Sequence, residues 1–339
     1  MASQLPTIVI PTRNRIDFLE LCLRSVFERQ DIVPNVVVSD NSSADLRGME
    51  TLRSKYPFSY VRQSGKLSMT DHHNACLALA STPWAFLLHD DDELYPNILG
   101  KLQSFLSRCD GVGIVVGGIQ YIDQQGTARG VWVPDTNGII KGEEAVLRLG
   151  LDFKTSPPGW VWNVKVFHQA GGFPDAHGIA ADYPLVLKLA YSHGVALFSE
   201  IVGRYRSGVQ QASDYSTREG AEATLGCSIR MAQLTRTIGC SARVAEQLED
   251  YMIWWIFSIV ASRWLQSHPF FVSRLCRKSS LAAPQNGPWK NRIREQYPVL
   301  FWRPQWVWLP LYKLAASYLP TFVRRKLSVG MRGLLRSIA

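Results

Sequence analysis

The chain alternates between short apolar runs and segments whose apolar residues repeat with a helical period. Apolar, largely β-branched runs fall at residues 7–10, 36–38 and 84–88, with a weaker run at 60–61. Such runs are typical of buried strands. Helical spacing is found in residues 70–80 and in the series Phe18, Leu19, Cys22, Leu23 and Val26. Strands and helices in short alternation predict an α/β domain with a mainly parallel sheet.

Polar residues follow three of the predicted strands. The first is followed by Pro11, Thr12 and Arg13, the second by Asp40, and the third by Asp90, Asp91 and Asp92. Ligands of parallel α/β sheets bind at the carboxyl ends of the strands. We therefore expect these three clusters to form one binding site.

The three adjacent aspartates indicate a divalent cation. Neighbouring carboxylates repel one another, and their oxygens favour a hard ion such as Mg²⁺ or Mn²⁺, which usually also carries substrate phosphates. The alternative is a solvated acidic loop that precedes a helix beginning near Pro96.

Downstream, further strands are predicted at residues 113–118, 130–133 and 195–201. A helix opens at Ala181-Asp182-Tyr183-Pro184, where proline suits the first turn and a carboxylate suits the positive helix end. Asp182 is therefore either a functional carboxylate or simply an N-cap. Residues 217–265 are predicted to be helical.

Composition and charge divide the chain into two parts. A hydrophobic content of 46% with 19% charged residues is typical of a globular protein, and six scattered cysteines without a CxxC pair indicate reduced packing residues in a cytosolic protein. No signal peptide and no membrane-spanning helix is expected, because the apolar runs are too short. The net charge of +9 is concentrated in residues 263–339, which contain 14 Lys/Arg and a single acid, Glu295.

The basic tail (residues 263–339) is also rich in Trp and Tyr around residues 301–313. Aromatic rings combined with cations favour attachment to an anionic membrane surface. A helical subdomain packed on the body and a nucleic-acid site are the alternatives, and the dense Trp-Leu-Pro segments argue against nucleic acid.

Five segments together resemble the family-two glycosyltransferases. They are residues 7–15 (TIVIPTRNR), 37–43 (VVSDNSS), 88–92 (LHDDD), 171–173 (GGF) and 181–183 (ADY). The resemblance covers about residues 5–210 and implies a GT-A fold and an inverting enzyme that uses a nucleotide sugar. In terms of domains, it implies a catalytic domain at residues 1–215, with a nucleotide-sugar half of about 1–110 and an acceptor half of about 111–215, followed by a helical region at 216–339.

The resemblance assigns roles residue by residue. Pro11 and Thr12 line the nucleobase pocket, with Arg13 beside them, and Asp40 hydrogen-bonds the base. The aspartates form the DXD motif, which contacts the ribose and holds the metal. Asp182 is the catalytic base, with Ala181 in place of the glutamate that often precedes it. On the acceptor side, the candidates are Gly172, Phe173 and Trp160, with a core position as the alternative for Trp160.

Three departures from the family pattern change these assignments. His89 stands where the first DXD acid is expected, which leaves Asp91 or Asp92 for the metal and Asp90 for the ribose. Gly208 replaces the histidine of a Tyr-Arg-x-His pattern, so that Arg206 either contacts phosphate or lies on the surface. Arg62 and Lys66 face either the nucleotide or solvent.

The resemblance implies a metal-dependent inverting glycosyltransferase of surface polysaccharide or glycolipid synthesis, peripheral on the inner face of the cell membrane. Its donor is a nucleotide-diphosphate sugar, with UDP or dTDP favoured, and its acceptor is a lipid-linked or other oligosaccharide. The alternatives are a polyprenyl-phosphate sugar transferase and an inactive glycan-binding or scaffold relative. A nucleotidyltransferase is disfavoured because the first loop, Pro11-Thr12-Arg13-Asn14, has no glycine.

Overall fold

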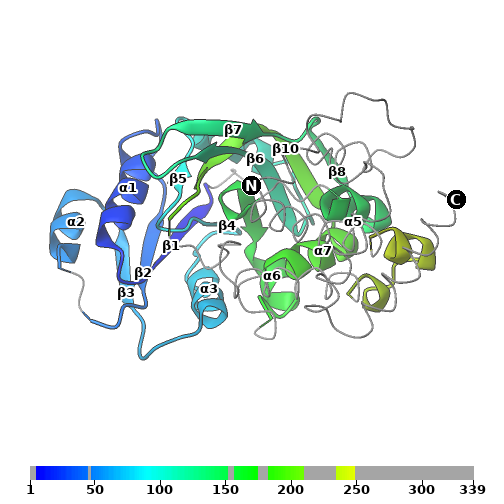
Figure 1. Ribbon diagram of the computed structural model, residues 1–339, viewed down its shortest axis with the longest axis horizontal. Coiled ribbons are helices and arrows are strands. Elements are labelled where there is room, and N and C mark those ends of the chain that lie inside the picture. The colour runs from blue at the N-terminus through cyan, green and yellow to red at the C-terminus, as the bar shows by residue number, and fades with distance from the viewer. Residues whose placement is uncertain (1–4, 45–46, 152–155, 175–181, 210–233, 249–339) are drawn as a thin grey trace, which may run out of the picture. The chain divides into compact units, whose positions relative to one another are not determined.

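The computed structural model describes residues 5–44, 47–151, 156–174, 182–209 and 234–248 (Figure 1). The chain divides into two compact units, Met1–Val244 and Ala245–Ala339. The basic tail lies outside the described residues. Of the predicted helical segment 217–265, residues 234–237 and 242–248 are described and are helical, with Gly239 in a left-handed turn between them.

A ten-stranded sheet forms the centre of the first unit, in the order β3-β2-β1-β4-β9-β6-β10-β5, with β7 paired to β6 and β8 paired to β10. The strands are β1 (Thr7–Thr12), β2 (Val36–Asp40), β3 (Ser59–Arg62), β4 (Trp84–Leu87), β5 (Glu93–Leu94), β6 (Ile114–Ile122), β7 (Ala128–Trp132), β8 (Gly138–Ile140), β9 (Trp160–Asn163) and β10 (Val195–Arg206). The predicted strands at the start of the chain are confirmed, and β1 to β4 run parallel.

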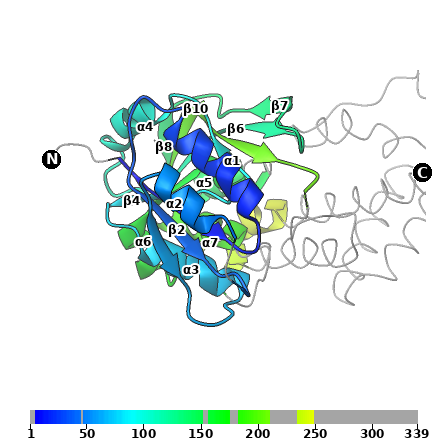
Figure 2. The ribbon, with the colours of Figure 1, turned by 90° about the vertical axis from the view of Figure 1, so that its left-hand side faces the viewer.

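In the described residues up to 209, the α-helices are α1 (Ile16–Phe27), α2 (Met49–Lys55), α3 (Met69–Ala78), α4 (Leu99–Leu106), α5 (Gly142–Leu151), α6 (Val164–Gln169) and α7 (Asp182–Ser192). The short 3₁₀ helix η1 spans Pro157–Gly159. Helices α1 and α2 lie side by side next to β2 and β3, whereas α5, α6 and α7 group beside the other half of the sheet (Figures 1 and 2).

Local sequence accounts for these elements. The apolar residues of β1, β2 and β4 are buried, as runs covered on both faces must be. In α1, Leu19, Cys22, Leu23 and Val26 face the core. Ser68 caps α3 by accepting the Asp71 N–H, and Asn163 caps α6 by accepting the Val166 N–H.

Two predicted boundaries differ from the structure. The helix expected near Pro96 begins at Leu99, because residues 96–97 form a turn in which Asn97 has a positive φ of 53°, outside the right-handed helical region. The last strand, expected to end at residue 201, continues to Arg206 through two irregularities between Phe198 and Gly203. Bulges of this kind bend a strand and redirect its side chains.

Among the described residues, no helix combines the length and apolar character needed to cross a membrane.

Gly203 marks a close approach of backbone to backbone, between β10 and η1. A Cβ atom at this position would lie 2.1 Å from the Pro158 carbonyl oxygen, whereas a Cβ at Gly138 would meet nothing within 4 Å. We predict that Gly203→Ala lowers the free energy of unfolding by about 1–3 kcal/mol, because overpacking must move η1. The matched variant Gly138→Ala should change it by less than about 0.5 kcal/mol. Urea denaturation measures both, and equal midpoints would contradict the predicted crowding.

Candidate donor and metal site

The three polar clusters predicted to form one site meet at the carboxyl ends of β1, β2 and β4. Thr12 lies opposite Asp40 in the parallel β1–β2 pair. On its other side, the Thr12 hydroxyl donates to Asp90 Oδ2 at 2.8 Å. The strand order therefore places Thr12 between the acid that ends β2 and the acids that follow β4.

The acidic loop (residues 89–93) is buried although it carries four consecutive carboxylates, Asp90, Asp91, Asp92 and Glu93. Arg15, just before α1, compensates the first two: its Nη1 lies 2.8 Å from Asp91 Oδ2, and its Nη2 contacts Asp90 Oδ1. Burial nevertheless raises the pKa of Asp90 to about 7, while the charge of Arg15 opposes that rise.

In the other half of the loop, the negative charge of Glu93 is compensated by arginines of β10 and of the segment after α1. Glu93 forms ion pairs with Arg29, Arg204 and Arg206. Arg204 and Arg206 are two residues apart on β10 and so lie on the same face of the strand. The Arg206 backbone N–H donates to Asp92 Oδ1 at 2.9 Å, and its side chain donates to the Asp91 carbonyl at 3.0 Å.

Arg206 is 2% exposed. It is therefore neither the surface residue nor the free phosphate contact that the sequence suggested. Its guanidinium is bound to Glu93 and to the carbonyls of Asp91, Asp123 and Gln124. Arg206 fastens the acidic loop to the end of β10.

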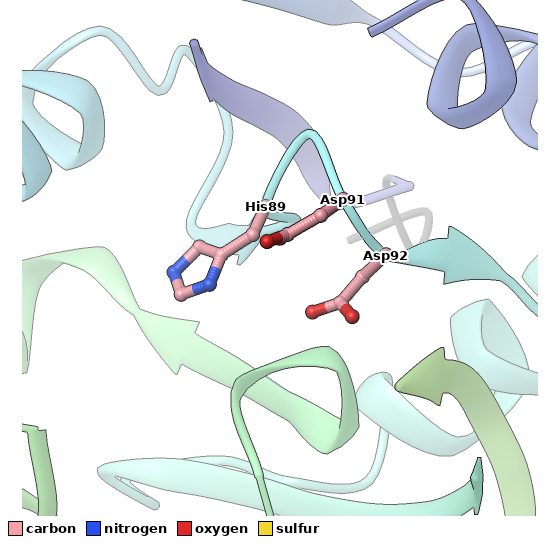
Figure 3. A group of neighbouring side chains, drawn as sticks. All are labelled: His89, Asp91 and Asp92. Atoms are coloured by element: carbon pink, nitrogen blue, oxygen red, sulfur yellow. The ribbon is translucent and has the colours of Figure 1, made fainter. Parts of the chain in front are cut away.

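His89, Asp91 and Asp92 form a group that can hold a metal ion. One potential ligand atom from each residue lies within 4.8 Å of the others. Figure 3 shows the three side chains leaving the acidic loop toward a common space. The Asp92 Oδ2 atom is buried and has no hydrogen-bond partner among the described residues, which is costly for a polar atom unless a cation or donor binds there. Burial and the adjacent Asp91 charge raise the pKa of Asp92 well above its usual value.

This donor set fits a divalent ion. Carboxylates suit Mg²⁺ and Mn²⁺, and an imidazole extends the range toward later transition metals. Asp91 and Asp92, the predicted metal residues, both belong to the group, whereas Asp90 points to Thr12 and Arg15. His89 was not predicted as a ligand. The available signal was its position in place of an acid within the DXD motif.

The ring of His89 is held in place from α3. His73 stacks on it with a centroid distance of 4.9 Å and an interplanar angle of 25°, and Phe173 packs edge-on against His73 at 6.1 Å. Burial lowers the pKa of His89 and lowers that of His73 well below its usual value. Both imidazoles are therefore neutral near pH 7, which is the form in which a histidine ligates a metal.

Asp40, the predicted base-binding residue, is buried and surrounded by donors. Its Oδ1 accepts the Ser42 N–H at 2.8 Å, and its Oδ2 accepts the Tyr60 hydroxyl at 2.8 Å and lies 3.4 Å from Arg62. The predicted residue Arg62 is thus brought to Asp40. Of the other predicted nucleotide residues, Pro11 is buried beside Thr12, while Arg13 and Lys66 are exposed.

Asp182, the predicted base, is the first residue of α7 and accepts the Tyr183 N–H at 2.8 Å. Burial raises its pKa to about 6. This geometry is that of a residue at the helix N-terminus, and the raised pKa is also suited to proton transfer near neutral pH.

The predicted acceptor segment is fixed to α3. Asn74 accepts the Phe173 N–H at 2.8 Å and donates to the Phe173 carbonyl at 3.0 Å. Gly172 has a φ of +69°, and a Cβ there would lie 2.6 Å from Asn74 Oδ1. Gly172 is thus required for this close approach, through which the segment joins the helix that carries His73.

Two predicted acceptor side chains are packed in the core instead. Trp160 is 1% exposed and packs edge-on against Trp162 and Tyr183. Phe173 is 4% exposed and packs against Trp162 and Phe167. Both rings lie among other aromatic rings, so neither offers a free face on which a sugar could stack. For Trp160 the core alternative is the correct one.

The fold is the GT-A fold, as its similarity to solved structures shows. The crystal structure of S. aureus TarS 1-349 matches with a TM-score of 0.54 at 16% identity, covering 94% of this chain and 82% of that one. The complex of TarS 1-349 with UDP matches with a TM-score of 0.53, and the complex with UDP-GlcNAc with 0.55, each at 17% identity over 73% of this chain and 70% of that one.

Sequence comparison confirms the predicted family resemblance for the first part of the chain. Residues 7–156 match the family model of Glycosyl transferase family 2. A segment of 102 residues is 31% identical to the uncharacterized protein MT1568 of Mycobacterium tuberculosis (strain CDC 1551 / Oshkosh). That segment is 30% of this chain, and the match spans about a third of the relative's length, 32%.

We predict that Asp92→Asn removes Mn²⁺ binding without unfolding the protein. The amide oxygen can still accept the Arg206 N–H, but a neutral amide is a much weaker ligand than a carboxylate. In a thermal-shift assay, Mn²⁺ should raise the melting temperature of the wild type by mass action and leave that of Asp92→Asn unchanged. The exposed Asp110→Asn is the matched control. An equal Mn²⁺ shift in both variants would contradict the site.

Proposed function

We propose that this chain is an inverting glycosyltransferase that moves a sugar from a nucleotide-diphosphate sugar to a hydroxyl group of a glycan acceptor, with Mg²⁺ or Mn²⁺ bound at the acidic loop. The observation that carries the proposal is the convergence of His89, Asp91 and Asp92 at the carboxyl end of β4, beside Thr12 and Asp40. Ligands of parallel α/β sheets bind at this edge. The family match over residues 7–156 supports the reaction class.

The donor we propose is a UDP or dTDP sugar. In this proposal Asp40 is the residue that recognises the base, as the family resemblance implies, and Pro11 and Thr12 lie on the adjacent strand. TarS, whose fold this chain shares, forms complexes with UDP and with UDP-GlcNAc. Asp90, anchored by Thr12 Oγ1, is the proposed ribose contact.

In this proposal a bound divalent ion stabilises the negative charge of the diphosphate leaving group. Asp91 and Asp92 hold the ion, with His89 as a further ligand. Asp182 takes the proton of the attacking acceptor hydroxyl. Its pKa of about 6 leaves it ionised at neutral pH and still basic enough to accept a proton.

The acceptor we propose is lipid-linked, and we place the enzyme on the cytoplasmic face of the membrane, in surface polysaccharide or glycolipid synthesis. The support is the charge pattern of the basic tail, with 14 Lys/Arg against one acid and a Trp-rich segment. Such segments bind anionic lipid surfaces. A peripheral enzyme of this kind would meet a membrane-bound acceptor directly.

The donor reaction can be tested with a panel of UDP-, dTDP-, GDP- and CMP-sugars, each with and without Mn²⁺. We expect Mn²⁺-dependent hydrolysis of one nucleotide sugar, which releases its nucleoside diphosphate. Once an acceptor is supplied, a glycosylated product should also form, and mass spectrometry detects both products. Asp182→Asn should lower transfer about 10²–10⁴-fold, the usual contribution of a general base, while Mn²⁺-dependent donor binding persists.

The pH profile gives an independent check on Asp182. A base must be ionised, so the transfer rate should fall as the pH drops through about 6, the raised pKa of this carboxyl. Transfer that survives in Asp182→Asn would favour a phosphate acceptor, which needs no strong base. If no nucleotide sugar of the panel binds to the folded protein, the enzyme proposal fails.

Membrane attachment can be tested by flotation with anionic liposomes. The full-length chain should float, and replacing Arg324, Arg325 and Lys326 by glutamate should weaken binding at least tenfold, since each basic residue near an anionic surface contributes about 1 kcal/mol. Neutral liposomes serve as the control. Equal flotation of both chains would show that these charges do not attach the protein.

A further inference from the structure

Arg15 holds two carboxylates of the acidic loop at once. It is the residue just before α1, at the end of the loop that follows β1. One guanidinium nitrogen lies 2.8 Å from Asp91 Oδ2, and another contacts Asp90 Oδ1. The side chain is 33% exposed, whereas those of Asp90 and Asp91 are 0% and 7% exposed. Arg15 therefore covers the two acids from the solvent side.

In this position, the positive charge of Arg15 would weaken the binding of a divalent ion to Asp91. Asp91 belongs to the group that can bind metal, and a guanidinium in contact with it opposes a second positive charge by Coulomb repulsion. Asp90 does not depend on Arg15 alone, because the Thr12 hydroxyl donates to its other oxygen. The loop would thus keep an anchor if Arg15 moved.

The same guanidinium is suited to a diphosphate. Its planar fork of N–H donors matches phosphate as well as carboxylate geometry. The neighbouring arginines are committed elsewhere: Arg29, Arg204 and Arg206 to Glu93, and Arg62 to Asp40. Arg206, in particular, is fully buried in the fold, and Gly208 offers no side chain to a phosphate.

We propose that Arg15 binds the diphosphate of the donor, and that it passes to the phosphate from Asp91 as a divalent ion ligates that carboxylate. The inference rests on the proposed function, because it assumes a nucleotide-diphosphate donor at this site. Before the donor arrives, Arg15 balances the charge of Asp90 and Asp91. Once the donor is bound, a divalent ion would compensate the charge of Asp91, and Arg15 would bind the diphosphate.

This movement of Arg15 from Asp91 to the diphosphate, called the handover below, predicts that one variant changes the affinities for Mn²⁺ and for UDP in opposite directions. Replacing Arg15 by glutamine removes a positive charge beside the ion, so Mn²⁺ alone should bind about tenfold more tightly. The same change removes a charge-assisted hydrogen bond to phosphate, so UDP in the presence of saturating Mn²⁺ should bind at least about tenfold more weakly. Electron paramagnetic resonance measures free Mn²⁺, and isothermal titration calorimetry measures UDP binding.

Arg15→Lys separates charge from geometry. The ammonium keeps the positive charge, so Mn²⁺ affinity should stay within about threefold of the wild type, but it lacks the planar fork, so UDP binding should still weaken. Arg24→Gln, an exposed arginine of α1 that pairs with Glu28, is the control and should change neither affinity. Circular dichroism shows that each variant is folded, and Arg15→Lys carries the test if Arg15→Gln does not fold.

The outcomes separate the inference from the proposed function. If Arg15→Gln weakens Mn²⁺ and UDP alike, Arg15 is a structural support and the handover is wrong. Unchanged UDP affinity in both Arg15 variants, with a wild type that releases a nucleoside diphosphate from its donor, overturns the inference alone. A wild type that binds Mn²⁺ but none of the nucleotides overturns both.

Discussion

Four consecutive buried carboxylates must be charge-balanced, and much of the structure around the site depends on how this is done. Asp90 and Asp91 pair with Arg15 before α1, and Glu93 pairs with Arg29 after α1 and with Arg204 and Arg206 at the end of β10. Asp92, between them, accepts the Arg206 backbone N–H. An unpaired buried charge costs several kcal/mol. The acidic loop therefore connects the loop after β1, the segment after α1 and the end of β10, and ion pairs with arginines hold it in place.

A second set of contacts extends from this loop to the Gly171–Gly172–Phe173 turn, the predicted acceptor segment. His89 stacks on His73, His73 meets Phe173, and the neighbouring Asn74 holds the Phe173 backbone through two hydrogen bonds. Helix α3 thus positions both a potential metal ligand and the Gly171–Gly172–Phe173 turn. A sugar donor at the acidic loop and an acceptor near this turn would be oriented by the same helix, as catalysis by proximity requires.

The strand ends, and with them the acids and Thr12, could be predicted from the sequence. Apolar β-branched runs indicate buried strands, and the polar residues that follow them mark where these strands end. The sequence could not predict the cations, since Arg29 and Arg206 are 64 and 113 residues away from Glu93. Arg206 pairs with Glu93 only once β5 and β10 lie together, and Arg29 only once the end of α1 lies beside β5. From the sequence alone, a metal ion or solvent was expected to compensate the charge of the aspartates. The burial of Phe173, and the choice between the two alternatives for Trp160, could not be predicted for a similar reason: both rings are buried only by aromatic residues that the fold brings to them from other parts of the chain.

In the proposed function, the acidic loop is held in place by arginines of this chain and also binds a nucleotide diphosphate through a metal ion. Anomalous diffraction at the manganese edge, from crystals grown with UDP and Mn²⁺, tests this second role. We expect one strong peak between His89, Asp91 and Asp92, with the diphosphate beside it and Asp90 still bonded to Thr12. A peak at another site, or UDP bound away from the carboxyl ends of β1, β2 and β4, would contradict it.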